Sequence, residues 1–167
     1  MKAKWFSFIL LALCLVLALT GCAGGSGGGG TSGGGTGNTF VVTNISPNDG
    51  LVITQVPGKG IKFTQGGVEW KIYVTLKLED DNTFSSVEQL WVDGIQGADS
   101  VFTGTWEQPS STTIVATATK EKDNLAGTTT TIDPPDVDNF TLSADGKTLT
   151  QTEEDPDYHT KLILTKQ

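Results

Sequence analysis

Apolar and polar side chains alternate strictly along residues 70–78, and this period of two constrains the fold more than any other feature of the sequence. One set of positions is apolar and the other is mainly polar: Trp70, Ile72, Val74, Leu76 and Leu78 against Lys71, Tyr73, Thr75 and Lys77. Successive side chains of a β-strand point to opposite faces, so the segment predicts a strand with one buried face and one face in water. The polar run 79–82 and the extended segment 83–92 then predict a hairpin.

Short threonine- and valine-rich segments separated by turn signals continue this pattern to the C-terminus. Further strands are expected at 39–44, 51–56, 61–63, 101–107, 114–119, 128–132, 137–142, 148–152 and 158–165. Asp145-Gly146 predicts a tight hairpin. The polar stretch 120–127 is expected to interrupt a strand, and Pro134-Pro135 is expected to end one. The sequence therefore predicts an all-β fold, an antiparallel up-and-down meander of about 8–10 strands forming a barrel or a barrel-like sandwich.

The N-terminus is typical of a secretory signal peptide. Lys2 and Lys4 precede an apolar stretch, 5–19, which is followed by small residues and Cys22. This stretch of about 15 residues is shorter than the roughly 20 needed for a membrane-spanning helix.

Leu19-Thr20-Gly21-Cys22 resembles the bacterial lipobox. The resemblance implies that residues 1–21 are removed and that Cys22 carries diacylglycerol and further acyl chains, such as palmitate, which together hold a protein stably at a membrane. It implies a location in the cell envelope: the outer membrane, on its periplasmic or surface face, where there are two membranes, and otherwise the outer face of the cytoplasmic membrane. The alternative is an ordinary signal peptide in which Cys22 has no role.

Three segments are expected: the signal peptide 1–21, the lipidated cysteine with a flexible linker 22–38, and a β-domain 39–167. The linker consists almost entirely of Gly, Ser and Thr and buries nothing, so it is expected to behave as a random coil spanning about 20–24 Å.

The composition excludes several classes of function. Cys14 lies in the signal peptide and Cys22 would be lipidated, so the domain has no thiol for a disulfide, a metal or a nucleophile. Loss of Lys2 and Lys4 takes the formal net charge from -8 to -10, and the sequence contains no arginine. An acidic surface without arginine is not expected to bind nucleic acid.

Residues 70–167 resemble a bacterial lipocalin-like lipoprotein domain. The resemblance rests on Thr75–Phe84 as strand, acidic turn and strand, on Gly104-Thr105-Trp106-Glu107 with the next strand, and on the hairpin Phe140–Leu149. It implies an up-and-down barrel, often with an apolar interior, and no common function. Gly67-Val68-Glu69-Trp70 departs from the spacing of the family's first Gly-x-Trp motif. Residues 39–66 have no counterpart, and could complete the barrel or add strands outside it.

Catalytic and metal sites find little support. His159 beside Asp155 and Asp157 lacks a nucleophile motif, and it is expected to be an exposed strand residue. The acidic runs 133–139 and 153–157 do not match a calcium loop and are expected to be solvated turns. A glycoside hydrolase would need a pair of carboxylates, for which Glu69, Glu88 and Glu107 are the candidates, but Glu88 and Glu107 are expected to face outward. We therefore expect no catalytic residue, no metal, no cofactor and no enzymatic activity.

Aromatic side chains on the predicted strands are the better candidates for binding. An eight-stranded barrel either fills its interior or holds one small ligand, and the candidate ligand-binding residues are Trp70, Trp91, Phe102, Trp106 and Phe140. The leading hypothesis is a membrane-anchored binding module for a small apolar ligand or envelope component. The alternative is a structural or protein-interaction lipoprotein with a filled barrel, whose partner the sequence does not identify.

Overall fold

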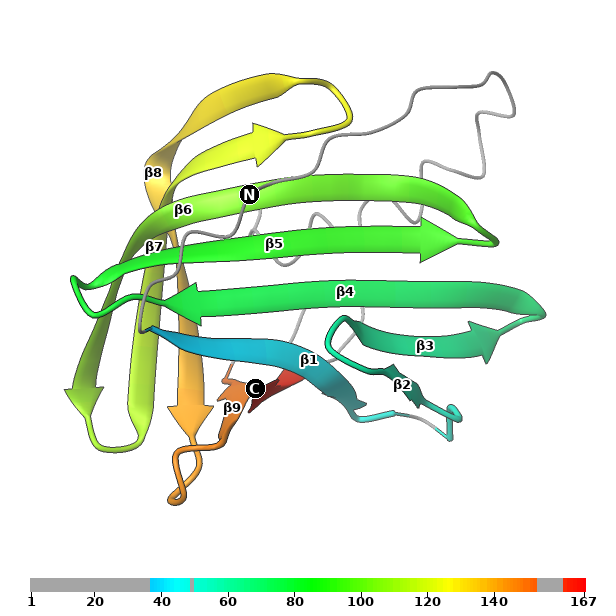
Figure 1. Ribbon diagram of the computed structural model, residues 1–167, viewed down its shortest axis with the longest axis horizontal. Helices are drawn as coiled ribbons and strands as arrows, with labels where there is room; N and C mark the ends of the chain where they lie inside the picture. Colours follow the sequence, from blue (N-terminus) through cyan, green and yellow to red (C-terminus); the bar gives the residue numbers. More distant parts are fainter. Residues whose placement is uncertain (1–36, 49, 153–160) are drawn as a thin grey trace.

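The computed structural model describes residues 37–48, 50–152 and 161–167. These residues form ten strands in one antiparallel sheet (Figure 1). The strands are β1 (Asn38–Ser46), β2 (Thr54–Val56), β3 (Gly60–Gln65), β4 (Val68–Leu78), β5 (Thr83–Val92), β6 (Ile95–Ser110), β7 (Thr113–Asp123), β8 (Thr128–Leu142), β9 (Thr148–Gln151) and β10 (Lys161–Lys166). Within the described residues, no helix is long and apolar enough to cross a membrane. The all-β, up-and-down prediction is confirmed.

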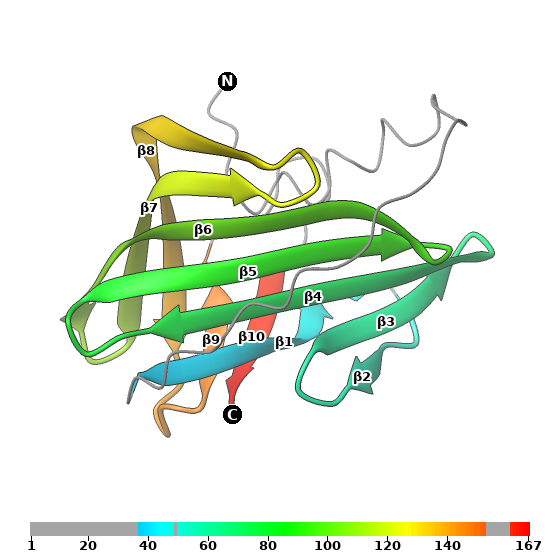
Figure 2. The same cartoon turned by 45° about the horizontal axis from the view of Figure 1, so that its top comes forward.

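Strand β1 closes the sheet into an eight-stranded barrel because it pairs with both β10 and β4. The closed ring consists of β1 and β4 to β10, in an arrangement that fits a lipocalin-like barrel. One edge of β4 is divided between two partners: residues 75–78 pair with β1, and residues 68–72 pair with β3. Figure 2 shows β1 and β3 one after the other along the same edge of β4. Residues 39–66 thus do both things that the sequence left open: β1 completes the barrel, and β2 and β3 extend the sheet beyond it.

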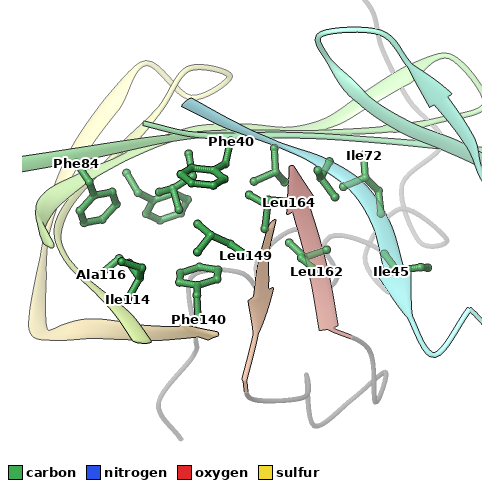
Figure 3. Packing of buried hydrophobic residues seen from close by; sticks show 14 of the residues in the cluster. Phe40, Ile45, Ile72, Phe84, Ile114, Ala116, Phe140, Leu149, Leu162 and Leu164 are labelled. Atoms are coloured by element: carbon green, nitrogen blue, oxygen red, sulfur yellow. The ribbon is translucent and has the colours of Figure 1, made fainter. Parts of the chain in front are cut away.

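The inner face of the barrel carries the hydrophobic core. In β4, Ile72, Val74, Leu76 and Leu78 are buried and Trp70 packs against them, which confirms the alternation predicted for this strand. In Figure 3, Phe84, Phe140, Leu149 and Leu164 point into the interior from different strands of the barrel. The interior of an eight-stranded barrel is just wide enough to be filled by such side chains or to hold one small ligand.

Gly104 allows β6 and β7 to approach closely. A Cβ atom at this position would overlap the carbonyl oxygen of Thr117 and would lie 3.0 Å from the Phe84 ring. The strands shift register here, with Gly104 opposite Ala118 and Thr103 opposite Lys120, so that Thr119 is an extra residue in β7. Glycine at a bulge permits the close backbone contact that a barrel corner requires.

The prediction that Pro134-Pro135 ends a strand was wrong, because β8 continues through both prolines to Leu142. Ala118 pairs with Asp136 and Lys120 pairs with Thr131, so residues 132–135 form an interruption in the ladder. Proline has no N–H to donate and is tolerated where no partner requires one. The strand therefore bends at the prolines instead of ending.

The prediction that residues 120–127 interrupt the sheet was also wrong for 120–123. These residues belong to β7 and pair with both β6 and β8, and the turn occupies 124–127. Figure 1 shows that β7 and β8 change direction part-way, so that their upper halves form a hairpin beside β6. Pairing on both sides supplies the backbone hydrogen bonds that this polar sequence needs to stay extended.

Candidate functional site in the barrel interior

Four of the five predicted aromatic residues lie on the inner side of the barrel. Phe102 and Phe140 are fully buried in the core, and Trp70 and Trp106 are half-buried against it. They come from strands β4, β6 and β8, so that the closed sheet brings together rings that are far apart in the sequence.

Trp91 does not join them. Along β5, the inward positions are the even-numbered residues from Phe84 to Leu90, and Trp91 therefore falls on the outer face. It lines a shallow outer groove of about 300 Å³ with Tyr73, Thr75, Val87 and Gln89. The strand period of two separates Trp91 from the interior, so it is not part of the interior site.

Trp106 has a structural role at one end of the barrel. Its Nε1–H donates to the Glu79 carbonyl oxygen at 2.9 Å, and its backbone N–H donates to the Asn82 carbonyl oxygen at 2.8 Å. Both acceptors belong to the turn between β4 and β5. Trp106 therefore fastens this turn to β6 and covers the end of the core, which is the way a buried tryptophan normally satisfies its N–H.

The structure contradicts the prediction that Glu88 faces outward. Glu88 is 0% exposed, on the inner face of β5 between the inward positions Ser86 and Leu90. Ser86, also fully buried, donates its hydroxyl hydrogen to Glu88 Oε1 at 3.0 Å. The alternation along the strand could have predicted this placement, because Glu88 lies an even number of residues from Phe84 and Leu90 and therefore shares their face. Glu107 is exposed, as predicted.

Burial raises the pKa of the Glu88 carboxyl well above its ordinary value of 4.5. The Ser86 hydrogen bond opposes this rise, and the charges of Asp138, Glu121 and Asp136 add to it. A carboxylate loses its hydration in such a place, so the neutral acid is favoured. A buried carboxyl with a raised pKa is a recognised sign of a functional position.

Polar side chains from β8 and β9 lie on the same inner surface. Asp138 is buried opposite Ala116 of β7, and Gln151 is buried opposite Phe140. Gln151 Nε2 donates to Asp138 Oδ1 at 3.4 Å, and its Oε1 accepts from the Leu162 N–H at the same distance. The interior thus combines an apolar wall with a buried group of acids and their hydrogen-bond donors.

The prediction that the acidic run 133–139 is a solvated turn was wrong, because the run lies within strand β8. Asp133 is exposed, Asp136 is half-buried and Asp138 is buried. Within the described part of the chain, no three His, Cys, Asp or Glu side chains are grouped in a way that could hold a metal ion. Cys22, His159 and the acidic run 153–157 lie outside the described residues.

Comparisons with protein-family models, curated proteins and solved structures find no match to this chain.

Proposed function

We propose that the protein is a non-enzymatic, membrane-anchored bacterial lipoprotein whose barrel binds a small, largely apolar molecule. The observation that carries the binding proposal is the closed eight-stranded barrel, whose inner wall is lined by Phe102, Phe140 and Leu164. A barrel of this size has room for packed side chains or for one small ligand. The buried polar groups on this wall support ligand binding, because a buried carboxyl costs free energy and contributes little to a wall that serves only for packing.

The anchoring proposal rests on the sequence 1–38 alone. Two or more acyl chains on Cys22 would hold the protein at a membrane, and the Gly/Ser/Thr-rich linker would let the barrel stand off its surface. Replacing Cys22 by serine should release the protein from membranes. A Cys22→Ser variant that still sediments with membranes would contradict the anchoring proposal.

Mass spectrometry of the intact folded protein tests ligand binding. The protein is purified from the envelope of its host without denaturation and is weighed before and after extraction with organic solvent. An added mass beyond the covalent lipid that disappears on extraction is expected, and the extracted molecule identifies the ligand class.

A mass that extraction does not change, even after incubation with envelope lipids, would contradict ligand binding. It would favour the alternative, in which the barrel is filled by its own side chains and the protein acts through its outer surface.

A further inference from the structure

The outer groove of about 300 Å³ over β4 and β5 contains two aromatic side chains, Tyr73 and Trp91. Neither ring belongs to the hydrophobic core. Tyr73 pairs with Gln89, so Trp91, two residues further along β5, is its diagonal neighbour. Diagonal neighbours of an antiparallel pair are about 7–8 Å apart, which is within reach of aromatic rings. The outer face of the barrel thus has an aromatic surface inside a groove.

The turn between β2 and β3 contributes to this groove through Gly58 and Lys59. Figure 1 shows the turn next to β4. It can lie this close because the following residue is glycine: a Cβ atom on Gly60 would overlap the Ile72 carbonyl oxygen and would lie 3.0 Å from the Tyr73 ring. The two strands that extend the sheet beyond the barrel therefore help to form the groove.

The polar side chains of the groove are not engaged elsewhere. In the part of the chain that the structure describes, no side-chain hydrogen bond or ion pair involves the Lys59 ammonium, the Tyr73 and Thr75 hydroxyls, the Gln89 amide or the Trp91 ring N–H. These groups include both donors and acceptors. Among the described residues no carboxylate lines the groove, although the chain has 19 acidic residues against 11 basic ones. A ligand that donates and accepts hydrogen bonds around an apolar surface fits this arrangement.

Three classes of small ligand differ in how well they match the groove. An inorganic anion would pair with Lys59 and leave the aromatic surface in water. A purely apolar molecule would cover the rings, but it would also remove polar groups from water without replacing their hydrogen bonds, which costs free energy. A pyranose sugar with equatorial hydroxyls meets both requirements, because its C–H faces are apolar and the hydroxyls around its edge donate and accept.

We infer that this groove binds a pyranose sugar with equatorial hydroxyls, such as a glucose unit, either free or as part of a glycan. Tyr73 and Trp91 contact a C–H face of the sugar, and Lys59, Thr75 and Gln89 exchange hydrogen bonds with its hydroxyls. A volume of about 300 Å³ is within the range of small-ligand sites. The groove lies outside the barrel, so this inference goes beyond the proposed function and does not depend on whether the interior holds a ligand.

The test follows the backbone amide signals by nuclear magnetic resonance while cellobiose is added to the whole exported protein carrying Cys22→Ser. Cyclohexanol and inorganic phosphate are titrated in the same way, because they represent the apolar and the anionic alternatives. Cellobiose should bind with a Kd on the order of 1 mM, since a shallow groove leaves one face of the sugar in water. The signals that shift should come from the residues that line the groove, and the other two molecules should not shift them.

Two substitutions test the residues that carry the inference. Trp91→Ala removes one of the two rings and should raise the Kd for cellobiose at least about tenfold, since a tryptophan at a contact often carries much of the binding energy. Gln89→Leu keeps an outward side chain of similar length but removes the amide, and it should also weaken binding. Val137→Ala, which shortens a side chain 42% exposed on β8, is the matched control and should leave the Kd unchanged.

Several outcomes would overturn the inference: no binding of cellobiose, shifts confined to other parts of the protein, or a Kd that neither Trp91→Ala nor Gln89→Leu changes. Cyclohexanol or phosphate binding to the groove as tightly as cellobiose would overturn it as well. Cellotetraose distinguishes the source of the sugar, since tighter binding than cellobiose indicates a glycan and equal binding indicates a free sugar. Failure of this inference would leave the proposal for the barrel interior untouched, because that proposal is tested by the extractable mass.

Discussion

Replacing Glu88 by glutamine should make the stability of the unliganded barrel less sensitive to pH. Glutamine has the same shape as the protonated acid, and its carbonyl oxygen can still accept the hydrogen bond from Ser86. The substitution therefore removes a titrating group while disturbing the packing little. Glu88 is 0% exposed, so solvent screening does not weaken the effect.

The sign and size follow from the raised pKa of Glu88. In the unfolded chain this carboxyl ionises near 4.5, and in the folded barrel it ionises at a higher pH. Its favourable contribution to folding is complete below 4.5 and is lost as the pH rises towards its folded pKa. In this window each pH unit changes the free energy of unfolding by about 1.4 kcal/mol for one proton. The stability of the Glu88→Gln variant relative to the original protein should rise by this amount per unit and level off above the folded pKa.

Urea denaturation of both proteins at about pH 5, 6 and 7 measures this difference. Glu121, Asp136 and Asp138 are present in both proteins, so the comparison removes most of their own titration. The same measurements on Glu107→Gln, which changes an exposed carboxylate, serve as the matched control. A flat difference for Glu88→Gln, or one that falls with increasing pH, would refute the reasoning that burial raises the pKa of this group.

Three further substitutions, two of them with a matched control substitution, test the packing of the barrel. Gly104→Ala should destabilise it by about 1–3 kcal/mol in urea, because the added methyl group meets the β7 backbone; an unchanged midpoint would show that the strands separate freely. Phe140→Ala should cost about 3–5 kcal/mol in the same assay, whereas Val137→Ala, at a side chain 42% exposed, should cost less than about 0.5 kcal/mol. Equal losses would place Phe140 outside the core. Trp106→Phe should cost about 1 kcal/mol more than Trp91→Phe, because only Trp106 donates its ring N–H to a partner in the described part of the chain. Equal thermal stability of these two variants would mean that the hydrogen bond to the β4–β5 turn contributes nothing.

Much of the fold could be predicted because strand formation is encoded locally. The alternation along 70–78 identified β4 and its buried face, and Asp145-Gly146 identified the turn between β8 and β9, where Gly146 has a φ of 69°. The errors in β7 and β8 have one cause. Residues 120–123 are extended because they pair with β6 and β8, and β8 stays extended through Pro134-Pro135 because it pairs with β7 on both sides of the prolines. Pairing with another strand leaves no trace in the composition of the segment itself.

The candidate site was harder to predict than the strands that form it. Phe102 and Phe140 were predicted as interior candidates, and both lie in the core. The predicted positions of Trp91 and Glu88 were wrong. The alternation along β5 places Glu88 on the same face as Leu90 and Trp91 on the opposite face. The apolar ring suggested that Trp91 lies inside, and the charge suggested that Glu88 lies outside. At both residues the face is instead set by the position along the strand.

The sequence by itself determined that the chain forms short antiparallel strands, and which residues of each strand share a face, because the period of two is a property of each segment alone. The tertiary structure decided how the sheet closes and what each buried group meets. Only the pairing of β1 with both β4 and β10 makes the barrel, and the order and register of the strands β5 to β8 bring Glu88 near Glu121, Asp136 and Asp138. Contacts across a closed sheet join residues far apart in the chain, and the electrostatic environment of a buried carboxyl is set by such contacts and not by its neighbours in sequence.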